Sequence, residues 1–159
     1  MNLLILGDVF GQPGREAVTS HLSVLRRDLQ IDVAIVNAEN AAHGFGLTEK
    51  IAGELYEAGA DILTTGNHVW DQRELIPYIE RDPRVLRPAN FPPGTPGSGT
   101  RLHQLGDGRS VLVVNLMGRL FMDPLDDPFR GLDAAIEGHA LGRDVTAIVV
   151  DFHGEATSE

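Results

Sequence analysis

Short apolar runs recur along the chain, and segments with helical spacing separate them. Each run has the length of a buried strand: 3–6, 33–36, 61–65, 111–115 and 147–151. Apolar residues at helical spacing between Pro13 and Leu29 predict a helix after the first run. A second helix is expected between a capping Thr48 and a terminating Gly59. Strands that alternate with helices predict an α/β fold, with a sheet buried by helices on both faces.

The second half of the chain is less regular. One helix is expected at about 72–80, where Pro77 limits its continuity, and another at 134–141. The segment 87–99 between them is rich in proline and glycine and predicts a long loop. It is not expected to link two domains, because strands resume after it. We therefore predict a single domain over residues 1–159.

Charge and composition exclude several kinds of partner. The formal net charge is −10, so long nucleic acid gripped by a basic face is not expected. Bound cations would reverse this sign locally, which keeps a small phosphate ester as a suitable ligand. No apolar run approaches the ~20 residues that span a bilayer, and the N-terminus lacks the pattern of a signal peptide. A cytoplasmic location without membrane contact is expected, and the oligomeric state, a homo-oligomer included, is left open.

Polar side chains follow four of the apolar runs at the point where each run ends. They are Asp8, then Glu39 and Asn40, then Asn67 and His68, and finally His153. In open α/β sheets, ligands bind at the carboxyl ends of the strands, so these side chains are expected to converge at one edge. His43 lies in the loop after Glu39 and is a candidate for contacting the substrate.

Carboxylate, amide and imidazole donors without sulfur suit hard-to-borderline cations, because the chain has no cysteine. We expect two divalent ions, Fe or Mn, with Zn or Mg as further options. A carboxylate such as Glu39 can bridge two cations, and such a pair activates water for attack on a phosphate ester. Each residue alone has a simpler explanation: Asp8 as a helix cap, Asn37 as a turn residue, and the histidines as hydrogen-bonded structural groups. The joint pattern favours a metal site.

Several segments resemble one known family. They are Gly7 to Arg15, Asn37 to Asn40, Gly66 to Trp70, Arg87 to Gly97 and Asp151 to Glu159. Together they are similar to the bacterial 2′,3′-cyclic-nucleotide 2′-phosphodiesterases, within the calcineurin-like metallophosphoesterases. The wider superfamily has histidine where this chain has Phe10, and aspartate where it has Glu39-Asn40; both departures match the bacterial family.

The resemblance implies a layered α/β sandwich and a two-metal centre. It makes Asp8, Glu39, Asn40, Asn67 and His153 metal ligands, with Glu39 bridging, and it gives His68 a catalytic role on the leaving group or transition state. The family continues with a Gly-Thr-His-Thr-His segment that is not found before Glu159. The C-terminal part of the fold is therefore expected to be missing. For the 159 residues alone, weak or single-metal occupancy and little phosphodiesterase activity are expected.

The leading functional hypothesis is hydrolysis of cyclic nucleotides, 2′,3′-cyclic and also 3′,5′-cyclic, by a hydroxide that bridges the two metals. A phosphomonoesterase or 5′-nucleotidase is an alternative, because the same metal site serves both reactions. A third hypothesis is a non-catalytic regulatory protein that holds metal and nucleotide without turnover. Assays of diesters against monoesters, and of turnover against binding, separate the three.

Overall fold

The computed structural model describes all residues from 1 to 159 and contains two β-sheets. The first sheet is fully parallel, and its strands follow one another in chain order. They are β1 (Leu3–Leu6), β2 (Val33–Asn37), β3 (Ile62–Thr64) and β4 (Val85–Leu86). In the second sheet the central strand pairs antiparallel with one neighbour and parallel with the other. Its strands are β5 (Thr100–Gln104), β6 (Ser110–Met117) and β7 (Ala147–His153).

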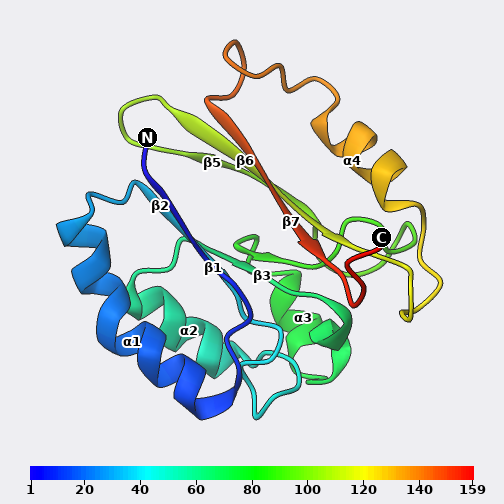
Figure 1. Ribbon diagram of the computed structural model, residues 1–159, viewed down its shortest axis with the longest axis horizontal. Helices are drawn as coiled ribbons and strands as arrows, with labels where there is room; N and C mark the ends of the chain where they lie inside the picture. Colours follow the sequence, from blue (N-terminus) through cyan, green and yellow to red (C-terminus); the bar gives the residue numbers. More distant parts are fainter.

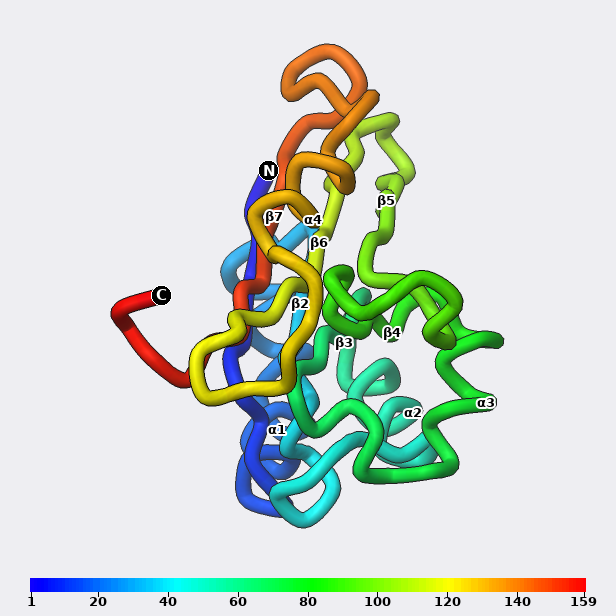
Figure 2. The backbone as a smooth tube through the Cα atoms, turned by 90° about the vertical axis from the view of Figure 1, so that its right-hand side faces the viewer, coloured from blue at the N-terminus to red at the C-terminus, as the bar shows by residue number.

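The helices lie outside the two sheets. Helices α1 (Gly11–Asp28) and α2 (Glu49–Ala58) pack against the first sheet, and α4 (Pro128–Ile136) packs against β6 of the second. Figure 1 shows α1 and α2 on one side of the strands and α4 on the other, and the view in Figure 2 agrees. A short 3₁₀ helix, η1 (Asn67–Trp70), and α3 (Leu75–Ile79) follow β3. None of the helices is both long and apolar enough to cross a membrane.

A separate apolar cluster fills the space between the sheets. Ile35 and Ile62 of the first sheet pack there with Val111 and Val113 of the second, all of them buried. Each sheet therefore has helices on one face and the other sheet on its second face. The predicted α/β class and layered sandwich are confirmed. The expectation of helices on both faces of one sheet was wrong, because the strands divide between two sheets that cover each other.

Most predicted strands and the first two helices are found near their expected positions. Thr48 caps α2 by accepting a hydrogen bond from the Ile51 N–H, and Gly59 ends this helix in the left-handed conformation with φ 114°. The helix expected at 72–80 is shorter, and α3 holds Pro77 in its first turn, where no intrahelical N–H is needed.

Three elements of the second half differ from the prediction. Helix α4 begins at Pro128 and not near 134, because the Asp127 carboxylate accepts hydrogen bonds from the N–H groups of Phe129 and Arg130. Strand β4 has only two residues, and β5 is an edge strand with a mixed polar sequence, so neither has a clear apolar signal.

The segment 87–99 is the predicted loop, and buried polar side chains fix its path. The Arg87 guanidinium donates to the carbonyls of Pro88, Thr95 and Pro96. Asn90 donates to the Met117 carbonyl and accepts from the Met117 N–H, which attaches the loop to β6. The loop thus carries the chain from the first sheet to the second along a defined route.

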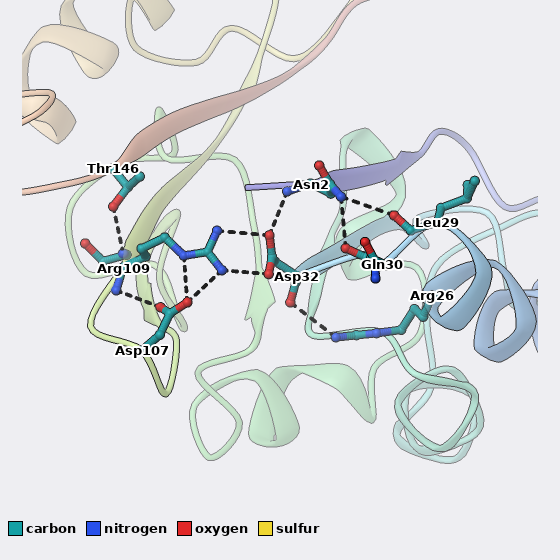
Figure 3. Close-up of polar contacts among 9 residues, drawn as sticks. Asn2, Arg26, Leu29, Gln30, Asp32, Asp107, Arg109 and Thr146 are labelled. Atoms are coloured by element: carbon teal, nitrogen blue, oxygen red, sulfur yellow. Dashed lines mark hydrogen bonds and ion pairs between the residues drawn. The ribbon is translucent and has the colours of Figure 1, made fainter.

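An ion pair joins the two sheets at the amino end of β2. The Arg109 guanidinium donates to both carboxylate oxygens of Asp32, at 2.7 and 3.1 Å, and also to Asp107 (Figure 3). The backbone N–H of Asn2 donates to the same Asp32 carboxylate at 2.7 Å. These bonds hold the pKa of Asp32 at about 2, below the usual range, with the Arg109 hydrogen bond as the main cause.

Candidate metal centre

Three of the predicted ligands meet at the carboxyl edge of the sheets. His153 ends β7, Asn67 follows β3, and Glu39 lies two residues after β2. The His153 Nε2 atom lies 2.9 Å from Asn67 Oδ1 and 3.0 Å from Glu39 Oε1. The structure therefore brings together side chains from three strands and both sheets, as the sequence pattern predicted for this edge.

Glu39 has an environment that is costly for a carboxylate. Its side chain is 1% exposed, and its Oε2 atom is buried without a hydrogen-bond partner. Burial raises the pKa of Glu39 to about 7, and the carboxylate of Asp8 adds to the rise. A buried and unpartnered carboxylate oxygen destabilises the metal-free fold, so its presence points to a missing positive partner.

Gly66 makes room for this cluster. A Cβ atom at this position would lie 2.0 Å from Glu39 Oε2 and 2.7 Å from the His153 ring. Glu39 and the end of β3 thus approach one another more closely than any side chain at this position permits. The structure thus gives a steric reason for glycine at this position.

Asp8 and Asn40 form a second, more exposed pair of candidate ligands. Asn40 Nδ2 donates to Asp8 Oδ1 at 2.7 Å, and Asp8 has a φ of 36°. Backbone bonds hold the two loops together, because Val9 N–H donates to the Asn37 carbonyl and Gly11 N–H to the Asn40 carbonyl. No three His, Asp or Glu side chains form one group that could hold a metal ion. Amide oxygens or water molecules would therefore complete a cation site made by these residues.

The donor set around His153 fits a divalent cation. A proton on Nε2 can make only one strong hydrogen bond, yet two oxygens from different strands face this nitrogen at hydrogen-bonding distance. Burial lowers the pKa of His153, which favours the neutral imidazole that binds metals. The residues that would hold an ion are Glu39, Asn67 and His153, with Asp8 and Asn40 beside them.

His68 lies next to this cluster, and a carboxylate orients its ring. Its Nδ1 atom is 2.7 Å from Asp71 Oδ2, which leaves Nε2 without an intramolecular partner. The Phe45 ring packs edge-on against the imidazole, with centroids 5.1 Å apart. A cleft of about 530 Å³ adjoins these residues; it is lined by Phe45, Asn67, His68, Asp71, Phe121, Met122 and Asp123. This arrangement suits proton transfer to a bound ligand.

The structure does not bring His43 to this cleft. His43 is exposed with a φ of 56°, and Phe45 of the same loop lines the cleft instead. Sequence reasoning missed Phe45 and Asp71. Asp71 lies three residues after His68, directly after η1 ends, and this spacing was the signal that could have identified it.

Comparisons with known proteins give a consistent result. A profile of the YmdB-like protein family matches residues 4–159. The chain is 46% identical over 159 residues to the 2′,3′-cyclic-nucleotide 2′-phosphodiesterase of Bacillus subtilis. Among solved structures, a Thermus thermophilus protein superposes with a TM-score of 0.91 at 45% identity, covering all of this chain and 60% of that one. A Mycoplasma pneumoniae phosphatase superposes with a TM-score of 0.86 at 33% identity, covering 98% of this chain and 56% of that one.

The matches cover only part of each relative. The chain aligns over its whole length but spans 59% of the Bacillus subtilis protein. The activities, substrates and partners of these longer proteins are therefore proposals for this chain.

Proposed function

The chain belongs to the YmdB-like protein family, and from this premise we propose that it supplies the catalytic site of a metal-dependent phosphodiesterase. The proposed substrates are 2′,3′-cyclic nucleotides, with 3′,5′-cyclic nucleotides as a second class. The observation that carries this proposal is the convergence of Glu39, Asn67 and His153 around one point, with a buried Glu39 oxygen left unpartnered. The printed name of the Bacillus subtilis relative supports the choice of substrate.

The proposed cofactors are two divalent ions, Fe or Mn, held by Glu39, Asn67 and His153 with Asp8 and Asn40. Such ions supply an activated water at neutral pH and neutralise the negative charge of the phosphate. The protein's contribution is to hold the donors in place and to keep Glu39 away from solvent. This local positive charge also explains how a chain with a net charge of −10 accepts a phosphate ester.

His68 has the geometry for a proton transfer step. Asp71 accepts a hydrogen bond from Nδ1, which fixes the orientation of the ring. When both ring nitrogens carry a proton, Nε2 donates its proton to the oxygen that leaves phosphorus, and the ring keeps the Nδ1 proton that it shares with Asp71. Opening a 2′,3′-cyclic phosphate at its 2′ bond in this way consumes one water and gives a nucleoside 3′-phosphate.

Phosphomonoester hydrolysis is the second candidate activity, because the Mycoplasma pneumoniae structural relative is described as a phosphatase. Purified protein loaded with Mn²⁺ should be incubated with 2′,3′-cyclic AMP and, separately, with 3′-AMP. The proposal expects 3′-AMP to accumulate from the cyclic diester. Release of inorganic phosphate from 3′-AMP with no cleavage of the diester would favour the monoesterase. Binding of Mn²⁺ and nucleotide without any product would favour a regulatory protein.

A further inference from the structure

Polar side chains connect the two sheets near the strand ends that carry the candidate metal ligands. The Asp151 carboxylate on β7 accepts a hydrogen bond from Asn37 Nδ2 on β2 at 3.2 Å. The same oxygen accepts a hydrogen bond from the Thr64 hydroxyl on β3. Asn37 and Thr64 are buried, at 6% and 0% exposure. Three strands from two sheets thus share one carboxylate; we call Asn37, Thr64 and Asp151 the inter-sheet brace.

Each residue of the brace lies two or three positions before a candidate metal ligand in the chain. Asn37 comes two residues before Glu39, and Asp151 two residues before His153. Thr64 is followed by Thr65 and Gly66, and then by Asn67. Because neighbouring residues in a chain move together, the position of Asp151 relative to the first sheet also sets where His153 meets Glu39.

The Asn37 amide links the brace to Glu39 by a second hydrogen bond. Its Oδ1 atom accepts from the Glu39 backbone N–H at 3.2 Å. An amide has a donor end and an acceptor end, and Asp151 accepts only from the donor end. The carboxylate therefore fixes which way the Asn37 amide faces, and the amide in turn fixes the backbone of Glu39.

Building on the proposed function, we propose that Asp151, Asn37 and Thr64 are positioning residues that hold Glu39 and His153 at metal-binding separation across the two sheets. Outer-sphere hydrogen bonds of this kind orient the ligands of metal sites and tune their affinity. Simple attachment of the sheets does not require the brace here. Arg109 and Asp32 already join the sheets at the opposite end of β2 (Figure 3). That ion pair is a natural control, because it also crosses between the sheets but adjoins no ligand.

Amide hydrogen exchange tests the brace without any metal. Thr64→Val replaces the hydroxyl by a methyl group of the same size and changes no charge, while Thr64→Ser keeps the hydroxyl. We expect the Glu39 amide to exchange at least about tenfold faster in Thr64→Val and Asp151→Asn, with Ile35 of the β2 core unchanged. Thr64→Ser and Asp32→Asn should leave the Glu39 rate as in the wild type. Equal Glu39 rates in the wild type and Thr64→Val would overturn the proposal, and Thr64→Val decides the question even where Asp151→Asn does not fold.

The affinity for Mn²⁺, measured by calorimetry on the same variants, tests the link to the site. Thr64→Val and Asp151→Asn should bind Mn²⁺ roughly 10–100-fold more weakly, and Thr64→Ser should restore the affinity. Asp32→Asn should lower the melting temperature without a change in affinity. If Thr64→Val loses no more affinity than Asp32→Asn, the brace has no positioning role. A wild-type chain that binds no Mn²⁺ would count against the proposed function, while the exchange rates would still decide whether the brace fixes Glu39.

Discussion

His153 Nε2 lies 3.0 Å from Glu39 Oε1, although the two side chains come from different sheets. This contact exists only when the sheets pack in one register, because His153 ends β7 and Glu39 follows β2. The candidate site is thus a product of sheet packing, and it does not sit within a single loop. Changes far from the site that loosen the packing of the sheets are expected to weaken it.

Replacing Glu39 by Gln should stabilise the metal-free protein at alkaline pH. The pKa of Glu39 is raised from 4.5 to about 7 in the folded chain, mainly by burial. Stability from this group is therefore fully present below pH 4.5 and is lost as the pH rises through 7. At pH 8 Glu39→Gln should raise the free energy of unfolding by roughly 1–3 kcal/mol, measured by urea denaturation in the presence of EDTA.

At pH 4 the same substitution should have little effect on stability, because Glu39 is then largely protonated in both states. His153 opposes Glu39, because burial lowers its pKa and its contribution to stability is lost as the pH falls. Because Glu39 and His153 are in contact, the difference between the variant and the wild type at each pH includes the change in the His153 contribution. In the presence of Mn²⁺ the wild type should be more stable than Glu39→Gln, because the substitution removes a metal ligand. A variant that is less stable than the wild type in EDTA at pH 8 would contradict the burial argument.

His68→Ala should leave metal binding intact and reduce turnover. His68 contacts Asp71 and Phe45, and no candidate ligand hydrogen-bonds to its ring. Loss of a proton donor costs roughly 10²–10⁴-fold in kcat, and Asp71→Asn should give a smaller loss because the ring is only misoriented. Metal content by mass spectrometry and hydrolysis of 2′,3′-cyclic AMP measure the two properties. His21→Ala, an exposed histidine on α1, is the control; loss of metal in His68→Ala would make His68 a ligand.

Gly66→Ala should damage the site more than the fold. The added Cβ would lie 2.0 Å from Glu39 Oε2, so the carboxylate has to move away from His153. We expect the Mn²⁺ affinity to fall by at least about tenfold, while the circular dichroism spectrum stays that of the wild type. Gly53→Ala on α2 has open space around the new methyl group and should change neither property. An unchanged affinity in Gly66→Ala would show that Glu39 is not held in place by the end of β3.

Much of the fold follows from the apolar runs and caps. The runs before Asp8, Glu39 and Asn67 became β1, β2 and β3, because buried parallel strands are nearly continuous in apolar residues. The division into two sheets could not be predicted. It depends on β5, an edge strand whose mixed polar residues resemble a loop, and on the route of segment 87–99 that Arg87 fixes.

The sequence predicts those site residues whose location in the fold follows from their position at the end of a strand. Asn67 and His153 converge because both come at strand ends. Asp71 and Phe45 were missed because their roles depend on the direction of a side chain, which strand periodicity does not give. The sequence pattern predicts Asn37 as a turn residue; the structure places it at the end of β2, where its side-chain Oδ1 accepts a hydrogen bond from the Glu39 N–H. Its contact with Asp151 depends on how the two sheets pack, so no local pattern reveals it.

Arg109→Ala should make the acid stability of the fold less dependent on pH. The pKa of Asp32 is lowered from 3.8 to about 2, chiefly by its hydrogen bonds from Arg109. This carboxylate adds stability above pH 3.8, and the contribution is lost as the pH falls through 2. Without Arg109 the melting temperature should fall less between pH 4 and pH 2 than it does in the wild type. Arg27→Ala, which breaks an exposed pair with the adjacent Asp28, should leave the slope unchanged.

Metal titration of this chain should give one tight site and one weak site. The His153 Nε2 atom lies 2.9 Å from Asn67 Oδ1 and 3.0 Å from Glu39 Oε1, and the Glu39 side chain is buried away from water. Asp8 and Asn40 are more exposed, and Asn40 turns its Nδ2 toward the Asp8 carboxylate, so one existing hydrogen bond must break before a second ion binds. Calorimetric titration with Mn²⁺ should therefore show two steps whose affinities differ by at least about tenfold.

The substitutions separate the two steps. Asp8→Ala should remove the weak step and keep the tight one, whereas His153→Ala should remove the tight step. Loss of the tight step in Asp8→Ala would mean that Asp8 completes the inner group, and that the Asn40 hydrogen bond describes only the metal-free protein. Two equally tight steps in the wild type would show that the exposed pair reorganises at little cost. That result would contradict the distinction between a buried and an exposed group of ligands.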